Sequence, residues 1–174
     1  AAHSLYVALA CHLASRKIDG WDDQVRARLR GAALTMNIAM APQQNQMARQ
    51  SEPLSTEQRR IIDDHATRGA AMLRELEIDE ADWIEAVAQH HQAGPGALEG
   101  RPPALQMARL IQRADRLTAS HSIRIGRAAR AAGDASRATY LDESKQPDPA
   151  GAALIKALGI YPPGTTVRLA GGEI

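Results

Sequence analysis

Apolar residues recur every three or four positions through most of the chain, which is the period of helices that bury one face. The pattern predicts a helix from Ala2 to about Lys17 and another from about Asp23 to Met40, which Pro42 would end. We expect the next segment, QQNQMARQSEPLS, to be a polar loop. Ser55 lies three residues before Gln58, the spacing of a capping box, and predicts the start of a third helix.

The rest of the chain continues this pattern and then changes. Further helices are predicted near 56–77, 79–91, 103–120, 122–140 and 148–158. In the tail GIYPPGTTVRLAGGEI, Pro-Pro-Gly favours a turn and TTVRL alternates like a strand. We therefore predict one all-α domain over 1–174, with a helical core at 1–158 and a short C-terminal β strand or hairpin within 159–174. The opening AAHSLYVALA lacks an initiator Met, and we expect a domain cut from a longer chain.

Composition supports helices and narrows the class of function. Of the 174 residues, 44% are hydrophobic but only 3% are aromatic, and Phe is absent, so alanine-rich helices can pack closely. The 21 basic and 20 acidic residues leave a net charge of +1, which argues against a nucleic-acid polymer as partner. The single cysteine, Cys11, fits a reducing, cytoplasmic setting. No apolar run approaches the roughly 20 residues that span a bilayer, so we expect no membrane insertion.

The helix predicted at 103–120 carries a carboxylate on its apolar side. Asp115 points about 140° away from the centre of a polar stripe, at about 100° per residue. We expect that stripe to face water; it consists of Gln106, Arg109, Arg113, Arg116 and Ser120. A buried carboxylate is costly unless it is paired or binds a metal. Asp115 is therefore a candidate for a salt bridge, a helix-to-helix hydrogen bond or a metal ligand.

Histidines lie on apolar faces as well. His90 and His91 end the helix predicted at 79–91 and share the side of its apolar residues. Either one alone could stabilise the helix dipole, but two adjacent inward histidines favour a binding site. His65 and His3 are each on an apolar face, where a hydrogen-bonded core histidine is the simpler explanation. Imidazole and carboxylate together are ligands that suit Zn, Fe or Mn.

Six short sequence motifs follow one another along the chain. They read HSLYVALACHLA, AALTMNIAMAP, LSTEQRRIIDDHATRG, QHHQ, ARLIQRADRLTAS and GIYPPGTTVRL. In this order and spacing they resemble the HD-GYP branch of the HD-domain phosphohydrolase superfamily over nearly the whole chain. The resemblance implies an all-α fold with a small C-terminal β element. Active members of that branch use a two- or three-metal cluster to hydrolyse cyclic di-GMP.

The resemblance also implies roles for individual residues. Arg124 matches a basic residue near the substrate phosphates. The positions that match metal ligands, here vestigial or serving a single ion, are His3, His65, His90, His91 and Asp115.

The departures from the family decide the functional prediction. Met36 and Asn37 stand where the family has its namesake His-Asp pair, and Met40 stands where it has a lysine. A shorter loop, QAGPGALEGRPP, replaces the Gly-Tyr-Pro loop. A thioether is a poor ligand for Fe, Mn or Zn, and a neutral carboxamide cannot bridge two cations. Two unbridged cations about 4 Å apart repel by several kcal/mol even at a protein-like dielectric.

We therefore expect no catalytic residues, and either no cofactor or one divalent ion. The prediction is a non-hydrolytic regulatory or interaction module in cyclic di-GMP signalling, whose partner is cyclic di-GMP or a signalling-domain protein. Two alternatives stay open. One is a residual metal-dependent phosphodiesterase that hydrolyses cyclic di-GMP, and the other is a purely structural helical domain whose histidines are core residues.

Overall fold

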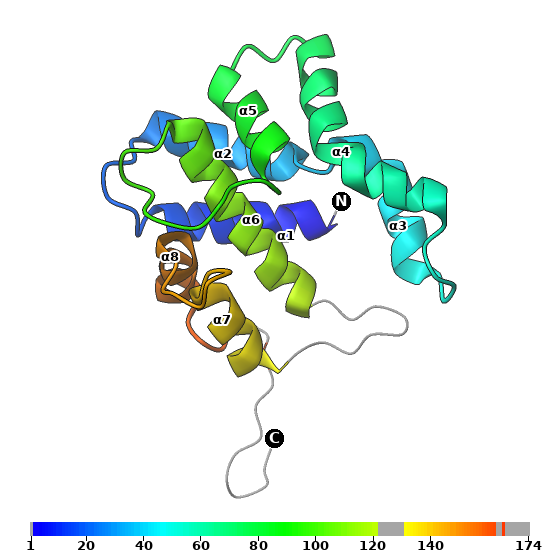
Figure 1. Ribbon diagram of the computed structural model, residues 1–174. Coiled ribbons are helices and arrows are strands. Elements are labelled where there is room, and N and C mark those ends of the chain that lie inside the picture. Colours follow the sequence, from blue (N-terminus) through cyan, green and yellow to red (C-terminus); the bar gives the residue numbers. More distant parts are fainter. Residues whose placement is uncertain (1, 122–130, 163–164, 166–174) are drawn as a thin grey trace, which may run out of the picture.

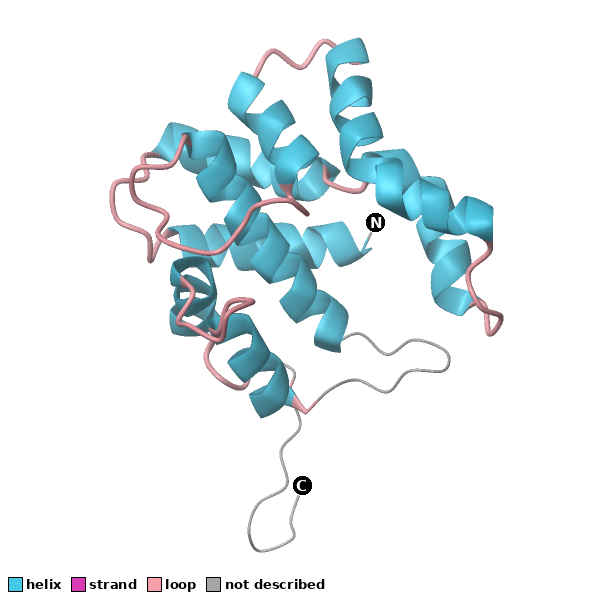
Figure 2. Cartoon of the chain, in the orientation of Figure 1, coloured by secondary structure: helices cyan, strands magenta, loops and turns pink. Residues whose placement is uncertain are grey.

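The structure is a computed structural model that describes residues 2–121, 131–162 and 165. Within these ranges it contains helices and loops, and the one extended contact is an isolated bridge between Leu141 and Pro147 (Figure 2). The all-α prediction is confirmed. The elements, in chain order, are α1 (Ala2–Ser15), α2 (Asp23–Thr35), the 3-10 turn η1 (Ile38–Met40), α3 (Ala41–Arg49), α4 (Thr56–Glu75), α5 (Ala81–Gln89), α6 (Pro103–His121), α7 (Ala132–Tyr140) and α8 (Pro149–Leu158).

Two predictions fall on residues that the structure does not describe. The predicted strand lies almost wholly within 166–174, and Arg124 lies within 122–130. None of the helices in the described ranges has the length and apolar character needed to cross a bilayer.

Helix α6 is the centre of the bundle, and it packs against α1, α5, α7 and α8 (Figure 1). Its apolar side chains are buried together with side chains from α1, α2, α5 and α8. Fully buried members of this core are Val7, Leu29, Met36, Val87, Met107, Leu110, Ile111 and Leu154. Burying each such side chain contributes about 1.5–3 kcal/mol relative to exposure, so the core holds α6 in a fixed position.

The start of α4 is as predicted. The backbone N–H of Gln58 donates to Ser55 Oγ at 3.1 Å, and the N–H of Ser55 donates to Gln58 Oε1 at 2.9 Å. The capping box is confirmed, and it satisfies two backbone donors that the first turn of a helix leaves free.

The prediction for residues 36–50 was wrong. Helix α2 ends at Thr35 rather than Met40, and the segment predicted as a polar loop is helical to Arg49. Pro42 lies in the first turn of α3, so it begins a helix instead of ending one. Proline is tolerated there because the N–H that it lacks has no partner in the first turn of any helix.

The predicted solvent-facing stripe of α6 was wrong at its centre, although Arg116 is exposed as predicted. Arg109 and Arg113 are 0% and 1% exposed, because α7, α8 and the loop between them cover this side. The Nε of Arg109 donates to Asp148 at 2.8 Å, and Glu143 accepts from the same guanidinium at 2.9 Å. The hydrogen bond from Arg109, opposed by partial burial and supported by a hydrogen bond from Arg116, lowers the pKa of Glu143 to about 2. The period of the polar residues identifies a polar helix face, but it does not tell whether that face contacts water or buried ionic partners.

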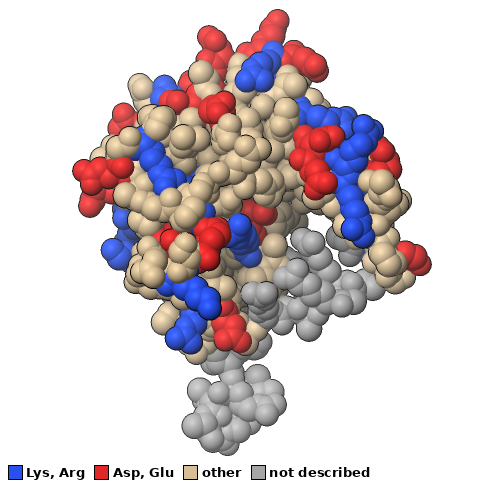
Figure 3. Space-filling view, in the orientation of Figure 1, with Lys and Arg blue, Asp and Glu red and all other residues tan. Residues whose placement is uncertain are grey.

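The molecular surface mixes charges of both signs. Figure 3 shows Lys and Arg side chains interleaved with Asp and Glu over the visible face. This agrees with the near-neutral net charge. That face offers no basic patch of the kind that binds a nucleic-acid polymer.

Candidate metal centre

Three histidine rings converge between α4 and α5. The Nε2 atom of His65 lies 3.2 Å from Nε2 of His90 and 3.2 Å from Nε2 of His91. One ligand atom from each residue falls within 4.8 Å of the other two. Among the described residues, no other group of three His, Cys, Asp or Glu side chains gathers in this way. We call these three residues the histidine cluster.

Close packing of α4 and α5 brings the cluster together. Gly69 lies one turn after His65, and a Cβ at Gly69 would lie 3.4 Å from Val87 Cγ1 of α5. This is ordinary van der Waals spacing, so α4 and α5 are in direct contact at this level. His90 follows Val87 by less than one turn and therefore faces His65.

Backbone carbonyls fix the orientation of two rings. Nδ1 of His65 donates to the carbonyl of Ile62, and Nδ1 of His90 donates to the carbonyl of Val87 at 2.7 Å. A carbonyl only accepts, so each Nδ1 carries the proton and each neutral ring has its lone pair on Nε2. Two such lone pairs face each other at 3.2 Å, and they repel unless a cation lies between them.

The two separations of 3.2 Å from His65 Nε2 fit a metal ion. Tetrahedral zinc with bonds of about 2.0–2.1 Å separates its nitrogen ligands by roughly 3.3 Å. The Nδ1–carbonyl bonds are the outer contacts that metal-binding histidines normally make. The cluster can therefore hold one divalent ion through three imidazoles and leave a fourth position open.

Burial favours the neutral form of His90 and His91. His90 is fully buried, and this burial, reinforced by the neighbouring charge of His91, lowers its pKa to about 4. His91 is exposed as a residue, which differs from the prediction, but its ring nitrogen faces the cluster. Desolvation there, with the charge of His65, lowers the pKa of His91 too. Neutral imidazole is the form that binds metal.

The low pKa of His90 predicts a pH dependence of stability. The unfolded chain binds a proton at this residue near pH 6.5, whereas the folded chain does so only near pH 4. The metal-free protein should therefore lose stability as pH falls from 6.5 to 4, by on the order of 3 kcal/mol. Urea unfolding in EDTA at several pH values measures this loss. His90→Gln should reduce the slope of the profile, with the remaining slope coming in part from His91, and a wild-type profile that is already flat would refute the assignment.

Asp115 and His3 form a separate pair beside the cluster. His3 Nε2 on α1 lies 2.6 Å from Asp115 Oδ1 on α6. Burial raises the pKa of Asp115, but the hydrogen bond from His3 and the charges of nearby histidines outweigh it, and the net pKa is lowered. This is the helix-to-helix hydrogen bond that the sequence left open. Neither residue belongs to the histidine cluster, and their role as metal ligands stays a prediction.

Comparison with known proteins adds the family. Residues 1–120, which run through nearly all of α6, match the model of the HD domain. The chain belongs to the HD domain family. This membership supports the HD-domain phosphohydrolase superfamily, whose domains are typically metal-dependent. Searches of curated proteins and of solved structures each gave no significant match.

The turn that the sequence resemblance matches to the family's namesake pair is buried and neutral, and that match stays a prediction. Met36 is 0% exposed and Asn37 is 5% exposed. The turn packs on α4 beside the cluster, since a Cβ at Gly69 would lie 3.4 Å from Ile38 Cγ2 and 3.9 Å from the Met36 carbonyl oxygen. Within the described structure the Asn37 side chain makes no hydrogen bond.

Sequence reasoning missed one polar contact of this HD domain. Gln112 is 4% exposed, and its Nε2 donates to the backbone carbonyl of His91 at 3.0 Å. Its place among the apolar neighbours of Asp115 on α6 was the available signal. The signal was weak because a buried glutamine is uncharged, and its burial does not require an ionic partner.

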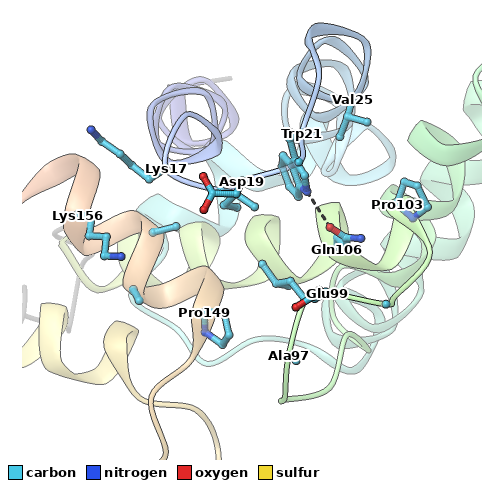
Figure 4. Close-up of a pocket in the computed structure, with 16 residues that line it drawn as sticks. Lys17, Asp19, Trp21, Val25, Ala97, Glu99, Pro103, Gln106, Pro149 and Lys156 are labelled. Carbon is cyan, nitrogen blue, oxygen red and sulfur yellow. Dashed lines mark hydrogen bonds between the residues drawn. The ribbon is translucent and has the colours of Figure 1, made fainter.

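A cavity lined by the α1–α2 connection, α6 and α8 lies away from the cluster. It has a volume of about 770 Å³ and lies between the α1–α2 connection, the start of α6 and α8 (Figure 4). Trp21 Nε1 donates to Gln106 Oε1 at 2.7 Å in its wall. No residue of the histidine cluster lines it. The convergence of nitrogen lone pairs, rather than cavity size, therefore identifies the candidate site.

Proposed function

We propose that this HD domain is a catalytically degenerate HD-GYP-type signalling domain that acts as a non-hydrolytic regulatory or interaction module in cyclic di-GMP signalling. One observation carries the proposal. Three imidazoles remain gathered in geometry suited to one ion, while the neighbouring turn presents the neutral side chains of Met36 and Asn37.

Charge compensation explains why a single ion fits and a pair does not. One divalent ion among neutral imidazoles needs no bridging anion. A second ion at bridging distance would add a repulsion of several kcal/mol, and the carboxamide of Asn37 supplies no charge to offset it. Two-metal phosphodiester hydrolysis needs both ions to stabilise the attacking and leaving oxygens. The residues present therefore support binding and not turnover.

The ion would have a structural role in such a module. It would join His65 on α4 to the end of α5 and stabilise the folded state in proportion to its affinity and concentration. Zn, Fe or Mn fits the imidazole ligands. The proposed partners are cyclic di-GMP or another signalling protein in the cytoplasm.

A second candidate function rests on the exposure of His91. Three imidazoles with a fourth, solvent-reached position form a recognised catalytic zinc arrangement. In this alternative the domain is a residual mononuclear phosphodiesterase that hydrolyses cyclic di-GMP.

A hydrolysis assay separates the two candidates. The purified domain, loaded in turn with Mn²⁺, Fe²⁺ or Zn²⁺, is incubated with cyclic di-GMP. We expect no linear dinucleotide or GMP above the level of His65→Ala, which removes the central ligand of the cluster. Turnover that is present in the wild type and absent in His65→Ala would support the mononuclear enzyme and contradict the proposal.

A further inference from the structure

Gln112 connects the histidine cluster to a buried ionic network. Its Oε1 accepts from Nη1 of Arg109 at 2.6 Å, and its Nε2 donates to the carbonyl of His91 at 3.0 Å. A guanidinium only donates and a carbonyl only accepts, so these two partners fix the orientation of the amide. Both Gln112 and Arg109 are buried, so water does not compete for either contact.

Arg109 extends the connection to the C-terminal helices. Its Nη1 also donates to the carbonyl of Ala93 at 2.9 Å, so the chain leaving α5 is held at two carbonyls. The guanidinium is anchored in turn by Asp148, at the start of α8, and by Glu143, in the loop before it. Helices α7 and α8 lie beyond the part of the chain that matches the HD domain.

The geometry of His91 depends on this support. Helix α5 ends at Gln89, so His91 lies outside its regular hydrogen-bonded turns. Its ring must nevertheless stay 3.2 Å from His65 to act as a ligand. Outer contacts that hold a metal ligand in place commonly change metal affinity by 10–100-fold when they are removed.

We propose that Gln112, held by Arg109, is a positioning residue of the metal centre, which fixes the backbone of His91 and couples α7 and α8 to the histidine cluster. This rests on the proposed binding of one ion by the cluster. Gln112 itself does not touch the ion. It acts by restricting where the third imidazole can lie.

The test is Gln112→Glu, titrated with Co²⁺ and followed by visible absorption. The carboxylate keeps an acceptor for Arg109 but cannot donate to the His91 carbonyl. We expect Co²⁺ to bind at least about tenfold more weakly, with a changed d–d spectrum. The added negative charge would by itself strengthen cation binding, so a loss of affinity cannot be a charge effect.

Gln106→Glu is the matched control. Gln106 lies on the same helix, accepts from Trp21 and donates to the carbonyl of Arg101 at 2.7 Å, away from the cluster. The same substitution there removes a comparable bond and adds the same charge. We expect its Co²⁺ affinity to stay within twofold of wild type. Gln112→Met, which loses both bonds at similar length, replaces Gln112→Glu if that variant does not fold.

The outcomes separate the two proposals. Equal Co²⁺ affinity and equal spectra for wild type and the Gln112 variant would overturn the positioning role and leave the single-ion site intact. A wild-type protein that binds no Co²⁺ would overturn both the positioning role and the single-ion site. Hydrolysis of cyclic di-GMP would overturn the non-hydrolytic function alone.

Discussion

Asp148→Ala should destabilise the domain by about 3–5 kcal/mol, because it leaves a buried guanidinium without its principal partner. Arg109 and Asp148 are both 0% exposed, and Glu143, the other carboxylate partner, is 39% exposed. Asp148 also accepts from the N–H of Gly151 at 3.0 Å and caps α8, which adds to the loss. For a domain of this size we expect the melting temperature to fall by roughly 10 °C.

Thermal unfolding of three variants tests this prediction. Asp148→Asn keeps a capping oxygen and loses the charge, so it should fall between Asp148→Ala and the wild type. Glu57→Ala removes the partner of Arg60 on the exposed face of α4, where both side chains are more than half exposed. Such a pair contributes little, and Tm should not change measurably. Equal Tm for Asp148→Ala and Glu57→Ala would show that the buried network is not a stabilising anchor.

The double substitution of Met36→His with Asn37→Asp should raise metal binding from one ion to two per chain. The new carboxylate would supply the bridging charge, and the new imidazole would supply another ligand next to α4. In the absence of metal the double variant should be less stable than wild type, because it buries a carboxylate where the Asn37 side chain has no hydrogen-bond partner among the described residues. Added Mn²⁺ should recover that loss by binding the folded state.

The measurements are metal content after dialysis and Tm with and without Mn²⁺. Asn45→Asp is the charge-matched control, since Asn45 is exposed on α3. It should change neither quantity. A double variant that folds but still takes up a single ion would show that the turn no longer lies where a second metal can bind.

The sequence predicted the helical elements better than it predicted their surroundings. The capping box at Ser55 and the helix at Pro103–His121 follow local rules and were found within a residue or so. The end of α2 and the start of α3 were missed because a proline permits either outcome. The burial of Arg109 was missed because its partners lie 34 and 39 residues further along the chain.

The predictions for the candidate site divide in the same way, between local placement, which the sequence predicts, and tertiary partners, which it does not. Inward placement of His65 and His90 followed from helical periodicity and is confirmed by their burial. The pairing of Asp115 with His3 was one of several possibilities that periodicity left open, because it depends on how α1 crosses α6. The support of His91 by Gln112 could not be predicted without the packed structure, since a glutamine on an apolar face can form its hydrogen bonds with many different partners.

The central claim is that the histidine cluster holds one ion and the Met36–Asn37 turn cannot hold a second. Native mass spectrometry of the wild-type domain, equilibrated separately with Zn²⁺, Mn²⁺ and Fe²⁺, counts the ions on each folded chain directly. We predict a single bound ion that is lost in His65→Ala and retained in Met36→Leu. Two ions on the wild-type chain, with one of them lost on substitution of Asn37, would contradict the account.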